Sequence, residues 1–195
     1  MYGKKAQAAQ QTVALLMHVL GNLEIPLGTF GFSDGVSRYR DFTDTLADTD
    51  RDAVIEQVDI AYQAGGGTND RAAIALVSGE MEPLEADRKI MFVVTDGEGT
   101  YGDIAPILAE AKRRGIEVIG IGLGPESRTV LKSYENAVYV DRIDELPDKV
   151  AALLEEDLLS ELGNPASASL VFGGTIYSHF LARYEAGAYA GLRKD

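Results

Sequence analysis

Hydrophobic and polar residues alternate along the chain with two different periods. Stretches in which apolar residues recur every three or four positions predict amphipathic helices, and short continuous or alternating apolar runs predict strands. The helical patterns lie at residues 4–20, 50–62, 69–81, 103–114, 126–132 and 146–159. The strand patterns lie at residues 25–32, 36–42, 89–95, 116–123 and 137–140. Helices and strands are therefore mixed along most of the chain.

The order of these elements predicts the fold class. From residue 89 onward, strands and helices alternate one by one, and this requires right-handed crossovers between parallel strands. The run 89–95 is largely apolar, as expected of a strand covered on both faces. Residues 36–42 instead alternate with charged residues, which is typical of a hairpin strand at a sheet edge. We predict an α/β protein with a doubly wound, mostly parallel sheet and one antiparallel edge strand.

One domain and an appendage account for the 195 residues. A chain of roughly 100–200 residues commonly forms one core. The helical and strand patterns continue to about residue 162, and residues 163–169 interrupt them with glycine, asparagine, proline and serine. The remaining residues show no clear period. We therefore predict one domain at residues 1–162 and a C-terminal appendage of unassigned structure at residues 163–195.

The composition narrows the chemistry that the chain can perform. It has no cysteine and two histidines, which excludes disulfides and thiol nucleophiles and disfavours a zinc site. The formal net charge of −13 repels nucleic acid and anionic lipid, and it favours cations and basic protein surfaces. No apolar stretch reaches the roughly 20 residues of a membrane span, and the first residues do not resemble a signal peptide. We expect a soluble, cytoplasmic protein that binds neither nucleic acid nor membranes.

Thr68 and Asp96 are the residues best placed to bind a ligand. In an open parallel sheet, ligands bind beyond the carboxyl ends of the strands. Asp96 directly follows the strand at 89–95, and Thr68 stands between three glycines and a helix. A carboxylate and a hydroxyl are oxygen ligands of the kind that Mg²⁺, Mn²⁺ or Ca²⁺ prefers. Each residue also has a structural interpretation, Thr68 as the N-cap of the following helix and Asp96 as part of a strand-ending turn.

Four segments carry a family resemblance. They are Phe30-Gly31-Phe32-Ser33-Asp34, Gly65-Gly66-Gly67-Thr68-Asn69, Val93-Val94-Thr95-Asp96-Gly97-Glu98 and Gly115-Ile116-Glu117-Val118-Ile119-Gly120-Ile121-Gly122-Leu123-Gly124. In this order and spacing they resemble the von Willebrand factor A (VWA) domains, over roughly residues 1–160. The resemblance implies a Rossmann-like fold with a metal ion-dependent adhesion site, in which Thr68 and Asp96 are metal ligands. It implies Mg²⁺, or else Mn²⁺ or Ca²⁺, as the cofactor and a protein partner that completes the metal site with an acidic side chain.

The start of the chain departs from the family pattern. The family's first metal-binding motif, Asp-x-Ser-x-Ser at the end of a central strand, is absent, and residues 1–6 resemble the residues that follow it. We therefore expect the central first strand to be missing, which leaves the strands at 25–32 and 89–95 each with an unpaired edge. We favour a reading frame that starts upstream, and residues 169–177 or a neighbouring chain are the other sources of a strand. With two protein ligands out of about six, Mg²⁺ binding should be weak.

A further resemblance concerns the partner. Residues 134–147 are similar to the closing segment of VWA proteins of the cobaltochelatase type, which work beside AAA+ ATPases of the MoxR group. This resemblance rests on fewer residues than the four segments above. It implies an AAA+ ATPase as one partner.

Three hypotheses for the function follow. The leading one is a metal-dependent module that binds a protein and is not an enzyme. The second is a VWA-like scaffold that has lost its metal site, because the first motif is absent. The third is a Mg²⁺-dependent hydrolase or phosphotransferase with Asp96 as nucleophile or metal ligand. Against the third, the glycines before Thr68 do not form the Gly-x-x-x-x-Gly-Lys-Ser/Thr pattern, and so few histidines leave no Ser/His/Asp arrangement.

Overall fold

The computed structural model describes residues 9–14, 17, 26–44, 53, 67–86, 88–95, 99, 101–142, 145–146, 148–150 and 152–153. Of the helix predicted at 4–20, residues 9–14 and 17 are described and are helical, and residues 148–150 of the helix predicted at 146–159 are helical too. Most of the predicted helix 50–62 and all of the predicted appendage 163–195 lie outside the described residues. No helix within those ranges is long and apolar enough to cross a bilayer.

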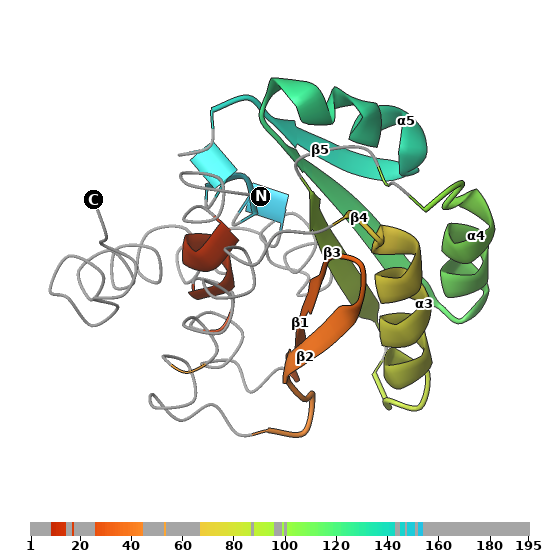
Figure 1. Ribbon diagram of the computed structural model, residues 1–195. Helices are drawn as coiled ribbons and strands as arrows, with labels where there is room; N and C mark the ends of the chain where they lie inside the picture. Colours follow the sequence, from red (N-terminus) through yellow and green to blue (C-terminus); the bar gives the residue numbers. More distant parts are fainter. Residues whose placement is uncertain are drawn as a thin grey trace, which may run out of the picture.

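Three parallel strands form the larger sheet (Figure 1). β3 (Lys89–Thr95) pairs with β4 (Ile116–Leu123), and β4 pairs with β5 (Asn136–Val140), so that β4 lies in the middle. The strands are rich in branched apolar residues, which suit a sheet covered by helices. The parallel pairing predicted from the alternation of strands and helices is confirmed.

A separate antiparallel hairpin precedes this sheet in the chain. It consists of β1 (Thr29–Phe32) and β2 (Val36–Arg40). The antiparallel pair predicted from the charged alternation is confirmed, but both strands are shorter than predicted. Pro26 has no N–H to donate to a ladder, which is consistent with β1 beginning after it.

Two helices lie side by side against the larger sheet (Figure 1). α3 (Asp70–Met81) agrees with the predicted range to within one residue, and Asn69 is its N-cap. α4 (Ala105–Arg113) packs on β4 and begins with a proline in its first turn, where a missing N–H costs no hydrogen bond. The helices therefore cover the sheet as the crossover connections require.

The segment predicted as a helix at 126–132 is helical throughout, but it is not one α-helix. The segment forms a short 3₁₀ helix, η1 (Pro125–Thr129), followed by a single turn, α5 (Val130–Ser133). It lies directly on β4, because a Cβ atom at Gly122 would stand 2.8 Å from the backbone oxygen of Ser127. Ser127 also donates its hydroxyl to the Gly124 carbonyl at 2.7 Å. Gly122 of β4 has no side chain, so the segment can lie directly on the strand, and this contact decides the local conformation of the segment.

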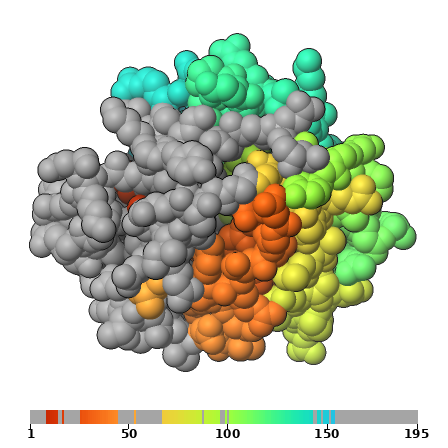
Figure 2. Space-filling view, in the orientation of Figure 1, coloured from red at the N-terminus to blue at the C-terminus, as the bar shows by residue number. Residues whose placement is uncertain are grey.

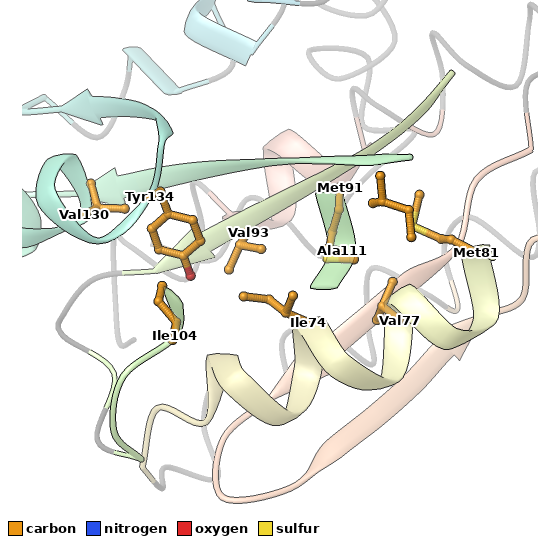
Figure 3. Close-up of a cluster of buried hydrophobic side chains, with 10 residues drawn as sticks. Ile74, Val77, Met81, Met91, Val93, Ile104, Ala111, Val130 and Tyr134 are labelled. Atoms are coloured by element: carbon orange, nitrogen blue, oxygen red, sulfur yellow. The ribbon is translucent and has the colours of Figure 1, made fainter. Parts of the chain in front are cut away.

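Two hydrophobic clusters form the core on opposite faces of β3. Figure 3 shows the first cluster, between α3, α4, α5 and the sheet. Its buried members are Ile74, Val77, Met81, Met91, Val93, Ile104, Ala111, Ile116, Val130 and Tyr134. The second cluster contains Ile119, Ile121, Leu123, Val140, Leu146 and Val150. The sheet is thus buried on both faces, as its apolar strands predict.

The hairpin packs against the larger sheet without pairing with it. Phe30 and Phe32 of β1 contact the first cluster, and Leu27, which precedes β1, contacts the second. In the described part of the chain, β1 pairs only with β2 and β3 pairs only with β4. One edge of β1 and one edge of β3 are therefore without a partner strand among these residues.

Candidate functional site

The predicted site lies at the carboxyl edge of the larger sheet. β3 ends there at Thr95, which is 4% exposed, and β4 ends beside it at Leu123. Asp96, the residue after Thr95, lies outside the described residues. Its role as a metal ligand therefore stays a prediction.

Thr68 lies in the short segment that leads into α3. Its side chain is partly buried. The interpretation of Thr68 as the helix N-cap is wrong, because Asn69 accepts the bond from the Ala72 N–H at 3.1 Å and so caps the helix. Asn69 also donates its backbone N–H to the Ser33 carbonyl at 2.8 Å and its side-chain amide to the Asp34 carbonyl at 3.1 Å. Capping therefore does not explain a hydroxyl at position 68.

Asp34, in the turn of the hairpin, joins the segments on either side of the site. One of its carboxylate oxygens accepts the Gly67 backbone N–H at 2.8 Å and the Tyr101 hydroxyl at 2.6 Å. These two hydrogen bonds, that from Tyr101 first, lower the pKa of Asp34. The same bond to Asp34 raises the pKa of Tyr101. Gly67, which precedes Thr68, and Tyr101, which follows Asp96 by five positions, thus donate to the same Asp34 oxygen.

The groups around Asp34 lie at the surface. Asp34 is exposed, and the Tyr101 side chain is 45% exposed although its hydroxyl is bonded. Figure 2 shows the hairpin (orange) directly beside the segment that leads to α3 and α3 itself (yellow). A partner that approaches Thr68 can therefore also reach the Tyr101 ring.

Asp70, the first residue of α3, lies below this surface and is 3% exposed. Its carboxylate accepts the hydroxyl of the buried Tyr134 at 3.2 Å and the Arg71 N–H at 2.9 Å. It also lies against Gly99, because a Cβ atom there would stand 2.6 Å from an Asp70 oxygen. Burial, followed by the nearby Asp70, raises the pKa of Tyr134 far above its usual range. A second carboxylate, two residues after Thr68, therefore contacts Gly99.

The side chains near Thr68 offer oxygen atoms that could coordinate a metal. A hydroxyl and carboxylates of this kind suit a hard divalent cation better than a soft one. No group of three or more His, Cys, Asp or Glu side chains that could hold a metal occurs among the described residues. Chemically the donors fit Mg²⁺, Mn²⁺ or Ca²⁺, and a complete set of ligands would have to include Asp96.

The sequence analysis missed the roles of Asp34 and Asp70. Asp34 belongs to the Phe-Ser-Asp segment that carries the family resemblance. The resemblance was therefore the available signal that Asp34 lies beside the glycines before Thr68. Asp70 has the pattern of an ordinary acidic residue in a first helical turn. Its burial depends on Tyr134, 64 residues away, and no local pattern predicts that contact.

The comparison with known families decides the classification. The model of the von Willebrand factor type A domain matches residues 3–146. The chain belongs to this family. The VWA fold class predicted from the sequence is thereby confirmed, with a parallel sheet and an antiparallel pair.

Solved structures with the same fold include the following two. Proximal thread matrix protein 1 from the mussel byssus has a TM-score of 0.64 at 18% identity, over 78% of this chain and 42% of that one. The von Willebrand factor type A protein from Catenulispora acidiphila has a TM-score of 0.54 at 15% identity, over 75% of this chain and 36% of that one. The chain thus spans less than half the length of these proteins. No curated protein was found to match the chain.

Membership in the family indicates a general class of function. VWA domains generally mediate interactions between proteins and are typically not enzymes. This class agrees with the leading hypothesis from the sequence. The metal and the AAA+ partner belong to the proposal that follows.

Proposed function

We propose that this VWA domain binds a protein partner through a divalent cation held by Thr68 and Asp96. One observation carries the proposal: the residues that flank the two predicted ligands are joined to each other. Gly67 and Tyr101 bond to the same Asp34 oxygen, and Asp70 lies against Gly99. These contacts support the proposal that Thr68 and Asp96 come close together at one sheet edge.

The charge at the proposed site favours an acidic partner. Thr68 supplies a neutral oxygen and Asp96 a single anionic one, so a bound Mg²⁺ keeps positive charge that a partner's carboxylate neutralises. The cation would supply this attraction and nothing else. Thr68, Asp96 and the Asp34 network would hold and orient the ligands.

We infer that a further strand belongs between β1 and β3. The inference is supported by the hairpin, whose β1 packs on the first core cluster without pairing with β3 in the described part of the chain. A parallel strand there would end near Thr68 and Asp96 and would add oxygen ligands at the same edge. An AAA+ ATPase as the partner remains part of this proposal and rests on the resemblance of residues 134–147 alone.

A scaffold without a metal is the second candidate. The sequence favours it, because the Asp-x-Ser-x-Ser motif of the family does not occur in the chain. The two candidates differ in one respect, because only the first requires the cation for partner binding.

The test is partner capture from an extract of the source cells with this chain as the bait. Binding should require Mg²⁺, disappear in excess chelator and disappear in Asp96→Ala. Glu85→Ala is the matched control, because it removes the same charge at an exposed position beyond the far end of α3. Binding that survives both chelator and Asp96→Ala would favour the metal-free scaffold. ATPase or phosphatase turnover lost in Asp96→Ala would favour the enzyme.

A further inference from the structure

A basic and apolar surface lies on the segment that follows β4. Arg128 in η1 and Leu131 and Lys132 in α5 are all exposed to solvent, Leu131 to 52%. Residues three and four positions apart lie on the same side of a helix, so these three side chains share one face. We call them the Arg128 face. They belong to the segment beside β5, at the opposite edge of the larger sheet from β3 (Figure 1).

The two cations of this face lack the ion pairs that are common elsewhere in the chain. Acidic residues outnumber basic ones by 31 to 18, so carboxylates are abundant. Cations that form an ion pair with a carboxylate include Arg38, Arg88, Lys112, Arg113, Arg114 and Arg142. Arg128 and Lys132 form none with any residue that the structure describes. Glu135, two residues after α5, is bound by Lys112 at 2.8 Å. The charges of Arg128 and Lys132 are therefore available to a partner.

Tyr139 of β5 holds the Arg128 side chain in place. The guanidinium carbon lies 5.0 Å from the centre of the Tyr139 ring, a distance that suits a cation–π contact. The Tyr139 hydroxyl donates to Asp141 at 2.7 Å, which fixes the ring. The hydrogen bond to Tyr139, more than the nearby Asp141 carboxylate, raises the pKa of Arg128. Arg128 is thus charged, held at one position and still exposed.

The backbone beneath the face is constrained as well. Ser127 is fully buried and donates to the Gly124 carbonyl at 2.7 Å, and Val130 is buried in the first cluster. A surface that is already ordered loses little entropy when a partner binds, and this favours binding. An exposed leucine alone is common on protein surfaces. Leu131 differs because it lies between two cations on a constrained segment.

We propose that the Arg128 face binds an acidic segment of a partner protein that also carries an apolar side chain. The planar guanidinium of Arg128 donates two parallel hydrogen bonds to one carboxylate, and Lys132 attracts a second. The apolar side chain of the partner packs on Leu131. Charge complementarity selects an acidic occupant, because a basic segment would be repelled at this face. The inference goes beyond the proposed metal site and does not depend on it.

The test is fluorescence anisotropy of two labelled peptides with the full chain in excess chelator, which removes any contribution of a cation. The probes are a peptide of repeated Asp-Glu-Leu units and a peptide of repeated Asp-Glu-Ser units. The wild type should bind the leucine peptide more tightly. Arg128→Gln and Leu131→Ser should each weaken that binding by about five- to tenfold, as the loss of one central interface contact implies. Leu131→Ser should leave the weaker binding of the serine peptide unchanged.

Two matched controls separate this face from the rest of the surface. Arg113→Gln removes an arginine charge at a position in α4 that is 74% exposed, and Leu76→Ser replaces a leucine of α3 that is 42% exposed. Both should leave peptide binding unchanged. All four substituted positions are exposed, so circular dichroism should show the same fold in every variant.

Several outcomes would overturn the proposal. These are a wild type that binds neither peptide, equal affinity for the two peptides, and losses in the controls as large as those in Arg128→Gln and Leu131→Ser. Self-association in sedimentation that Arg128→Gln abolishes would instead assign the face to a second copy of this chain. Because chelator is present throughout, failure here leaves the proposed metal site untouched, and failure of the metal site leaves this result unchanged.

Discussion

Replacing Gly120 by alanine should destabilise the domain through Tyr134. A Cβ atom at this position would stand 2.5, 2.7 and 2.9 Å from three atoms of the Tyr134 ring. Ordinary Cβ contacts are no shorter than about 3.4 Å, so the ring has to move by several tenths of an ångström. The ring is buried in the first cluster and bonded to Asp70, and movement therefore disturbs both.

The magnitude follows from these two losses. Overpacking of a filled core costs about 1–3 kcal/mol. Weakening the buried bond to Asp70 adds about 1 kcal/mol. The lower chain entropy of alanine in the unfolded state offsets about 0.5–1 kcal/mol of this. We expect the free energy of unfolding to fall by about 2 kcal/mol, within the range of these terms.

Urea unfolding followed by circular dichroism measures this difference. Gly79→Ala is the control, because its methyl group meets only an Arg114 nitrogen at 3.9 Å and replaces glycine within α3. That variant should be more stable than the wild type by about 0.5–1 kcal/mol. If Gly120→Ala is as stable as Gly79→Ala, the close contact between β4 and Tyr134 is not present in solution.

Two further predictions concern the surface of the site and the open strands. In the folded state the pKa of Asp34 lies below its ordinary value of 3.8, so its hydrogen bonds contribute stability above that pH, and this stability is lost as the pH falls through the lowered pKa. Tyr101→Phe should raise the pKa of Asp34 toward 3.8 in a carboxyl NMR titration, and an unchanged value would mean that Tyr101 does not donate to Asp34. We also expect this chain alone to unfold readily or to self-associate, because β1 and β3 each have an edge without a partner in the described part of the chain; a sharply cooperative monomer in sedimentation and thermal unfolding would contradict this.

Local patterns predicted the fold well where burial follows sequence period. The apolar run at 89–95 became β3 with the same bounds, and the strand 116–123 became β4 likewise. The segment predicted as one helix at 126–132 is a 3₁₀ helix followed by a single α-helical turn, and it packs directly on Gly122, a contact that periodicity does not contain.

The candidate site shows the same limit more sharply. Thr68 and Asp96 could be proposed because each sits beside a recognisable local signal, a run of glycines and a strand end. Asp34 and Asp70 acquire their roles from Tyr101 and Tyr134, which lie 67 and 64 residues further along the chain. Contacts at such separation are fixed by topology and packing, so only the folded chain reveals them.

The most direct test of the account is binding of Mn²⁺ to the purified chain, measured by electron paramagnetic resonance. The wild type should bind one ion weakly, with a dissociation constant on the order of millimolar, because most of the coordination shell is left to water. Asp96→Asn should abolish this binding, and Glu85→Gln, the matched change at an exposed site, should leave it intact. Binding that is equal in all three proteins, or absent from the wild type, would contradict a metal site at Thr68 and Asp96.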